Sequence, residues 1–165
     1  MAKDAKILIA DDSAFMRKML RTLLEGAGYS NITECGDGKE ALEKGYDEAV
    51  FLNNLNFVAE GSISNIFIIK DSVVFTPSLD TGILKGITRD VVIEIAADFG
   101  IKCSENYLKT DDILTADEVF MTNSLMEIIP VREIDGQIFS DRCPGIITAD
   151  FMRKYREKID KEQAA

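Results

Sequence analysis

The sequence predicts an α/β fold: one mixed domain in which an N-terminal parallel βαβ unit joins a larger mixed sheet. Residues 6–10, KILIA, read as a buried strand, an amphipathic helix follows, and NITEC at 31–35 gives a second strand. Strand, helix and strand in this order are typical of a parallel pair with a right-handed crossover. The apolar runs at 65–70 and 73–76 read as a β-hairpin around Asp71, so antiparallel pairing is expected too.

Length and composition indicate a single globular domain. A chain of 165 residues can bury most of one core, and 46% hydrophobic with 29% charged residues is an ordinary soluble composition. No proline- or serine-rich linker, repeat or low-complexity run divides the chain. We therefore expect one domain over residues 1–165 and one sheet that includes both halves.

Charge and residue content argue against several classes of function. The formal net charge of −10 disfavours nucleic acid and anionic membrane surfaces as partners. The N-terminal apolar run is far too short for a signal peptide or a membrane span. Three scattered cysteines fit a reducing cytosol, so a cytoplasmic protein is expected. The absence of histidine removes Ser–His and Cys–His nucleophile pairs and the usual zinc sites.

The N-terminal helix carries an apolar stripe that we expect in the core. Ser13 is the expected cap of this helix, and its stripe consists of Phe15, Met16, Met19, Leu20, Leu23 and Leu24. Gly26 and Gly28 end the helix, and a second short helix is expected over 37–45. If both halves share a sheet, one continuous core follows, made of Phe15, Met19, Leu23, Val50, Leu52, Phe67, Ile69, Val92 and Ile95.

The remainder of the chain mixes helices and strands. One helix, ended by Gly100, has a predicted buried face of Val91, Val92, Ile95, Ala96 and Phe99. The other expected elements are strands at 101–106, 117–123 and 127–134, a short helix at 110–116, a tight turn at Asp135-Gly136 and a final helix at 148–161.

An acidic residue and a helix start stand out between residues 45 and 89. Glu60 lies in the segment AEGSISN between two apolar runs, and residues 86–89, GITR, open an amphipathic helix with Thr88 as the expected N-cap. The amides of this helix start would point outward and form an anion site. Taken alone, Glu60 could be a solvent-facing turn residue, and the helix start only a cap.

These motifs follow one another in a familiar order: E-G-x-x-x-N, a hairpin, a T-P loop and G-I-T-R. The series continues through ADEVFMTNSLMEIIPVREIDG at 116–136 and CPGIIT at 143–148. Residues 41–150 therefore resemble the fold-type-IV, or class IV, pyridoxal-phosphate enzymes: branched-chain and D-amino-acid aminotransferases and aminodeoxychorismate lyase. The resemblance implies the mixed sheet of a large-domain fragment over 45–150, with residues 151–165 as a C-terminal helix and tail.

The resemblance also implies a cofactor, pyridoxal phosphate, and residues that hold it. In the family, the glutamate matching Glu60 pairs with the pyridine nitrogen, which makes the ring an electron sink. The helix start at Ile87 and Thr88 holds the phosphate through backbone amides. A second phosphate donor follows the later strand, where Ser124 is the best match. Alternatively, Ser124 could be part of an ordinary strand-to-loop step.

One residue of the family pattern is missing. The family carries its Schiff-base lysine about twenty residues before the G-Y-D step, and here that region, 22–28, contains no lysine. The nearest lysines, Lys18, Lys39 and Lys44, occupy surface or loop positions. No catalytic residue is therefore assigned, and pyridoxal phosphate is expected to bind weakly or not at all. The family enzymes usually work as dimers, which implies a possible homodimer.

The first 44 residues resemble a different family. ILIADDSAFMRKMLRTLLEGAGY followed by CGDGKEALEK, about residues 5–44, is similar to the start of a response-regulator receiver domain. That resemblance implies Mg²⁺ binding at Asp11 and Asp12, although both could simply be solvated strand-end acids. The phospho-accepting aspartate is replaced by Asn53. The alternatives are a receiver-like Mg²⁺-binding or interaction module that cannot be phosphorylated, or a fold chimera without biochemical activity.

Overall fold

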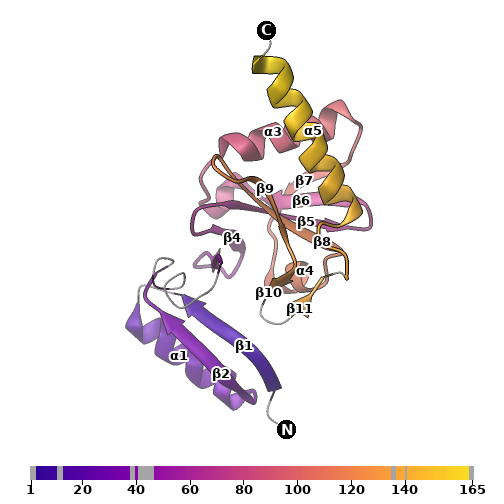
Figure 1. The fold of residues 1–165 in the computed structure, drawn as a ribbon. Helices are drawn as coiled ribbons and strands as arrows, with labels where there is room; N and C mark the ends of the chain where they lie inside the picture. The colour runs from indigo at the N-terminus through magenta and orange to yellow at the C-terminus, as the bar shows by residue number, and fades with distance from the viewer. Residues whose placement is uncertain are drawn as a thin grey trace.

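The computed structural model describes residues 3–10, 13–37, 40, 47–134, 137–139 and 141–163. Figure 1 shows a central sheet with helices α3 (Ile87–Asp98) and α5 (Ile146–Gln163) on one face, and a β1-α1-β2 unit (residues 3–35) that stands apart from that sheet. The mixed α/β architecture agrees with the fold class that the sequence predicts. No helix among the described residues has both the length and the apolar run that crossing a membrane requires.

The N-terminal unit is the predicted parallel βαβ. It consists of β1 (Lys3–Ala10), α1 (Ala14–Gly26) and β2 (Tyr29–Cys35), with β1 and β2 paired in parallel. Ser13 caps α1 as expected, because its hydroxyl accepts the amide of Met16 at 3.4 Å. Gly28 follows the helix with φ of 93°, a conformation that glycine adopts without a steric penalty.

The expectation of one sheet through both halves is wrong. Among the described strands, β1 and β2 form a sheet of their own, and β3 (Val50–Leu52) pairs antiparallel with β4 (Val58–Gly61). Asn53 explains the difference, because its side-chain oxygen accepts the amides of Leu55 and Phe57, both at 3.0 Å. This turn sends the chain straight back along β3. Asn53 is therefore a turn former, and β3 is not a parallel neighbour of β1.

The central sheet has five strands in the order β7-β6-β5-β8-β9. The predicted hairpin joins β5 to β6 through Asp71 and Ser72, whose φ angles are 49° and 62°. Only the β6–β7 pairing is parallel; β5, β8 and β9 pair antiparallel. The strands are β5 (Asn65–Lys70), β6 (Val73–Pro77), β7 (Cys103–Asn106), β8 (Glu118–Asn123) and β9 (Glu127–Val131).

The two faces of this sheet bury separate apolar clusters. One face packs against α3 (Ile87–Asp98) and α5 (Ile146–Gln163), where Phe120 stacks between Phe67 and Phe151 with ring centroids 4.9 and 5.8 Å apart. The other face packs against α4 (Thr110–Leu114) and β4. Its buried members are Val58, Ile66, Ile68, Leu108, Ile113, Ala116, Val119 and Met121. The remaining short elements are η1 (Leu79–Thr81), β10 (Glu133–Ile134) and β11 (Gln137–Ile138).

Helix α5 starts at a carboxylate from the sheet. Glu118 of β8 accepts the amide of Ile147 at 3.0 Å and that of Thr148 at 2.8 Å. A side chain at Gly145 would collide with this carboxylate, so only glycine lets the chain pass so close to it. The position of α5 on the sheet is therefore tied to β8.

Several predicted core residues are exposed. Phe15, Met19 and Leu23 of α1 are 74%, 41% and 63% exposed, and Leu52 is 47% exposed. Helix α1 instead turns Arg21 toward β2, where its guanidinium donates to the carbonyl of Ile32 at 2.8 Å. The single continuous core is therefore wrong for this part of the chain. Most of the helix expected at 37–45, the Asp135-Gly136 turn, Asp11 and Asp12 lie outside the described residues.

Candidate functional site

A cavity of about 200 Å³ opens where three loops meet. Its walls are residues 60–65, Leu84, residues 86–88 and residues 123–124. These segments include the ends of β4 and β8 and the beginnings of β5 and α3. All four cofactor residues predicted from the sequence, Glu60, Ile87, Thr88 and Ser124, lie in this wall.

Glu60 is held by two hydrogen bonds on one oxygen. Its Oε2 accepts the amide of Leu84 at 2.9 Å and the side-chain amide of Asn65 at 3.3 Å. Neither bond uses Oε1, which has no partner among the described residues. A fixed carboxylate with one oxygen left over can accept a hydrogen bond from a protonated ring nitrogen.

Asn65 joins the two sides of the cavity and was not singled out from the sequence. Its side-chain amide also donates to the carbonyl of Leu84 at 2.9 Å, and its oxygen lies so close to Gly86 that any side chain there would overlap it. Asn65 is buried, at 6% exposure. The signal was available, because Asn65 is the last position of E-G-x-x-x-N.

Helix α3 begins two residues earlier than expected, and its N-cap is Gly86 instead of Thr88. Ile87 and Thr88 therefore occupy the first turn, where backbone N–H groups have no acceptor within the helix. The hydroxyl of Thr88 points inward and donates to the carbonyl of Asn123 at 3.1 Å. The helix start thus offers backbone amides and the positive end of its dipole to the cavity.

A buried arginine, Arg89, supports the start of α3. Arg89 is 1% exposed, and its guanidinium donates to the carbonyl of Pro77 at 3.0 Å and to Glu105 at 2.6 Å. These bonds tie α3 to the ends of β6 and β7. In the sequence, Arg89 is only the last residue of G-I-T-R, because a position in a helix does not reveal that a charge is buried.

Ser124 is presented by a turn at the end of β8. The side-chain oxygen of Asn123 accepts the amides of Leu125 at 3.0 Å and Met126 at 2.7 Å, which leaves Ser124 exposed beside the cavity. Thr122 is 1% exposed and does not line the cavity. The geometry thus favours Ser124 over its neighbour as a donor to an anion.

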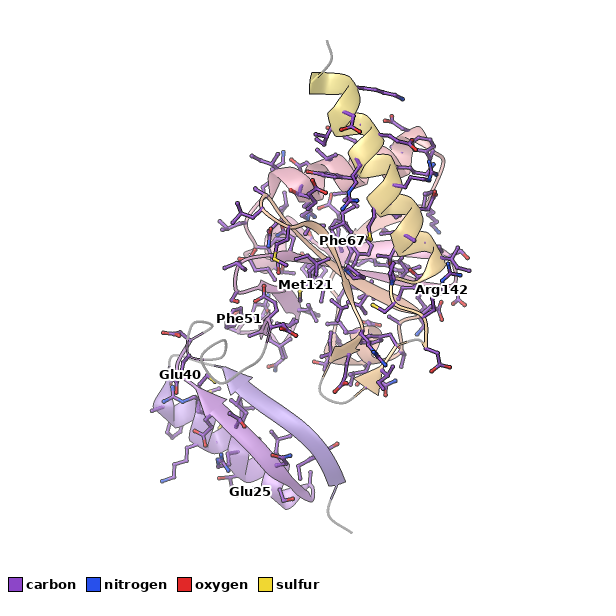
Figure 2. The ribbon with its side chains drawn as sticks, viewed as in Figure 1. Glu25, Glu40, Phe51, Phe67, Met121 and Arg142 are labelled. Atoms are coloured by element: carbon purple, nitrogen blue, oxygen red, sulfur yellow. The ribbon has the colours of Figure 1, made fainter. Side chains whose placement is uncertain are left out.

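No lysine lines this cavity among the described residues. Lys85 is 66% exposed and pairs with Asp90 at 3.5 Å, while Lys18 is exposed on α1. Lys39 and Lys44 lie outside the described residues. Figure 2 labels Glu25, from the segment where the family lysine would fall, at the end of the β1-α1-β2 unit far from Met121 and Phe67.

The predicted metal residues, Asp11 and Asp12, lie outside the described part of the chain. Within that part, no group of three or more acidic, cysteine or histidine side chains could hold a metal ion. The side-chain amide of Asn53 donates to the carbonyl of Thr81 at 3.2 Å, which fits its role as a turn residue. The Mg²⁺ site therefore stays a prediction.

Comparison with known proteins identifies the larger part of the chain. The family model described as amino-transferase class IV matches residues 35–134. The chain belongs to the class IV aminotransferases. A branched-chain-amino-acid aminotransferase of Pseudomonas aeruginosa is 39% identical over 127 residues, which cover 77% of this chain and 41% of that protein.

Solved class IV structures agree with the fold. The branched-chain amino acid aminotransferase of Thermobaculum terrenum, in its pyridoxal-phosphate form, aligns with a TM-score of 0.70 and 37% identity over 73% of this chain and 40% of its own. That of Thermoproteus uzoniensis, with norvaline, aligns with a TM-score of 0.69 and 32% identity over 94% of this chain and 51% of its own. The chain spans about two fifths of the length of the curated relatives that it matches.

The second structural alignment bears on the N-terminal unit. Coverage of 94% of the chain must include much of residues 1–44. The alignment with a class IV aminotransferase thus extends into the β1-α1-β2 unit as well as over the central sheet. The match supports no separate receiver domain.

Proposed function

We propose that this chain is a class IV aminotransferase-like fragment that holds pyridoxal phosphate weakly and does not turn over substrate. The observation that carries the proposal is the meeting of Glu60, Ile87, Thr88 and Ser124 at one cavity that no described lysine lines. The residues at hand suit the phosphate and the pyridine nitrogen. They do not suit the aldehyde, which needs a desolvated amine nearby.

The phosphate side is supported by the start of α3. The backbone amides of Ile87 and Thr88 and the hydroxyl of Ser124 are donors on one wall, and the helix dipole favours an anion there. Gly86 allows the loop to approach Asn65 closely enough to shape this wall. No cationic side chain lines the cavity among the described residues, so neutral donors would bind and orient the anion.

The pyridine side is supported by Glu60. Its carboxylate is fixed by Leu84 and Asn65, so Oε1 can hold a proton on a ring nitrogen. When bound, pyridoxal phosphate supplies an electron sink for reactions at an amino acid's α-carbon. The Leu84 amide ties Glu60 to the segment that precedes α3, so the two ends of one ring-and-phosphate molecule can be held together.

The cavity is small for a complete cofactor site. Its volume of about 200 Å³ lies below the ~300–1,000 Å³ of usual ligand pockets. The relatives carry more than half of their length outside the matched part, which leaves room for further walls in those proteins. We expect an affinity in the millimolar range, about −4 kcal/mol.

The test combines binding with covalent mapping. Pyridoxal phosphate is titrated into the wild-type protein and into Glu60→Ala, with the exposed Glu94→Ala of α3 as a matched control for charge. We expect millimolar binding that Glu60→Ala weakens and Glu94→Ala leaves unchanged. Borohydride reduction and peptide mapping should find no stoichiometric label on any single lysine. A single labelled lysine, lost in Glu60→Ala, would restore the enzyme hypothesis.

The same proposal includes a homodimer, because a fragment with an incomplete site gains walls from a second copy. Analytical ultracentrifugation with and without pyridoxal phosphate measures this directly. A monomer at all concentrations, with unchanged cofactor affinity, contradicts the dimer.

For residues 5–44 we retain a receiver-like segment as part of the proposal, within one domain over 1–165. The parallel β1–β2 pair and the Ser13 cap support it. A Mg²⁺ titration of the wild type against an Asp11→Asn, Asp12→Asn double variant tests it. Equal thermal shifts in both proteins would leave only the class IV assignment.

A further inference from the structure

The loop that carries Glu60 is closed by a second carboxylate outside the predicted set. Glu48 lies just before β3, opposite the turn at residues 61–64. Its Oε1 accepts the amides of Ala49 at 3.0 Å and Ser62 at 2.9 Å, together with the hydroxyl of Ser62. Its Oε2 accepts the hydroxyl of Ser64 at 2.8 Å. Both oxygens are therefore committed to this turn.

Close packing around the turn makes Glu48 hard to replace. A side chain at Gly61 would collide with the Ser64 hydroxyl and meet the Glu48 carboxyl carbon at 3.0 Å. Ser64 is 7% exposed, so its hydroxyl has little access to water as a substitute partner. Without the carboxylate, buried donors would lose their acceptor, which costs free energy and favours another loop conformation.

The same turn forms one wall of the cavity. Residues 60–65 all line it, and Glu60 and Asn65 stand at the two ends of the segment that Glu48 holds. Glu48 itself is not part of that wall. Glu48 therefore supports the loop, whereas Arg89 and Thr88 support the start of α3.

We infer that Glu48 is a positioning residue that fixes the 60–65 loop and thereby the pyridine side of the cavity. This inference rests on the proposed function for its ligand, pyridoxal phosphate. Its action is indirect: Glu48 holds Ser62 and Ser64, these fix the turn, and the turn sets the direction of the Glu60 carboxylate. The phosphate side, at the start of α3, has supports of its own in Thr88 and Arg89.

The effect of removing the Glu48 charge distinguishes a positioning role from a purely electrostatic one. Glu48 is a second negative charge near a cavity proposed to bind an anion. If its charge were the main influence, Glu48→Gln would tighten binding of pyridoxal phosphate by removing repulsion. If the hydrogen bonds of Glu48 position the loop, the same change weakens binding of pyridoxal phosphate. The NH₂ group of glutamine replaces one carboxylate oxygen and cannot accept the hydrogen bonds that this oxygen now receives.

The experiment compares Glu48→Gln with Glu118→Gln in the full chain. Glu118 is a matched control: it is also half-buried and accepts two hydrogen bonds, but its partners are the amides at the start of α5. Both variants should lower the melting temperature. Only Glu48→Gln should weaken pyridoxal phosphate, by about fivefold or more. Inorganic phosphate, which needs only the helix start, should bind all three proteins alike.

A ligand-free readout keeps the two proposals separate. In ¹⁵N–¹H spectra, Glu48→Gln should shift the Gly61 and Ser62 amides and speed their hydrogen exchange, while Glu118→Gln should not. If the wild type binds no pyridoxal phosphate, the proposed function fails alone, and these amides still decide the role of Glu48. Unchanged amides, or equal cofactor affinity in wild type and Glu48→Gln, would overturn the inference.

Discussion

The β1-α1-β2 unit and the central sheet differ in how far they bury the apolar face of a helix. In the central region, α3 buries Val92, Ile95 and Ala96 against the sheet. In the N-terminal unit, no described residue of α1 is fully buried, and Phe15 is 74% exposed. The apolar periodicity is stronger in α1 than in α3. It predicts where a helix forms, but burial of the apolar face depends on the area of sheet beneath it, and two strands cover less than five.

The largest expected effect contrasts the cores of the two regions. Phe120→Ala removes a ring that is 0% exposed and stacked on both sides, so it should lower the free energy of unfolding by about 3–5 kcal/mol. Leu23→Ala, at 63% exposure, should change it by less than about 0.5 kcal/mol. Urea unfolding of both variants measures the contrast.

Phe120→Ala also tests the proposal of one domain. The chain has no tryptophan, so Tyr29→Trp in β2 supplies a unique fluorescent reporter for the N-terminal unit. In the Tyr29→Trp background, Phe120→Ala should move the fluorescence transition and the circular-dichroism transition together. A fluorescence transition that stays in place would show two independent units.

A middle-sized effect comes from two glycines with opposite surroundings. Gly86→Ala forces a Cβ onto the side chain of Asn65, so it should destabilise the chain by about 1–3 kcal/mol and weaken cofactor binding. Gly26→Ala, at the last position of α1, meets nothing within 4 Å and should stabilise by about 0.5–1 kcal/mol. Thermal unfolding of both variants gives the two signs. The same sign in both would show that one of these environments is wrong.

The smallest expected effect is a dependence of folding stability on pH through Glu48, which lies just before β3. Burial opposes its ionisation, but hydrogen bonds from Ser62, Ala49 and Ser64 outweigh this and lower the pKa of Glu48 below its ordinary value. Its stabilising contribution is therefore complete above the unfolded pKa of about 4.3 and is lost as the pH falls through the lower folded pKa.

Thermal unfolding of wild type and Glu48→Gln from neutral to acidic pH measures this contribution. The difference in melting temperature should be constant near neutrality and shrink in acid. A difference that persists unchanged to the lowest pH would mean that the shape of the side chain matters, and its charge does not.

Much of the fold followed from local patterns. The β5–β6 hairpin, α3, α5 and the parallel β1–β2 pair lie where periodicity and turn residues predict them. The pairing of β3 did not, because it depends on how Asn53 folds back on Leu55 and Phe57. Sheet membership is a long-range property, and three apolar residues in a row do not specify their neighbour.

The candidate site divides in the same way. Glu60, Ile87, Thr88 and Ser124 were found through motifs, and the structure brings them to one cavity. Glu48 and Arg89 were missed, since each acts through partners distant in the sequence. The N-cap at Gly86 was missed because a threonine two residues later is the stronger capping residue by side chain alone.

The contact of Glu118 with the start of α5 has a practical consequence for labelling or tethering the protein. It anchors one end of α5 to the sheet, and Figure 1 shows the opposite end of α5 projecting beyond the rest of the fold. A label, tether or fused domain added through a helical extension there would inherit a fixed direction. Single-molecule or surface measurements could then hold the chain by a rigid handle that leaves the loops around Glu60 untouched.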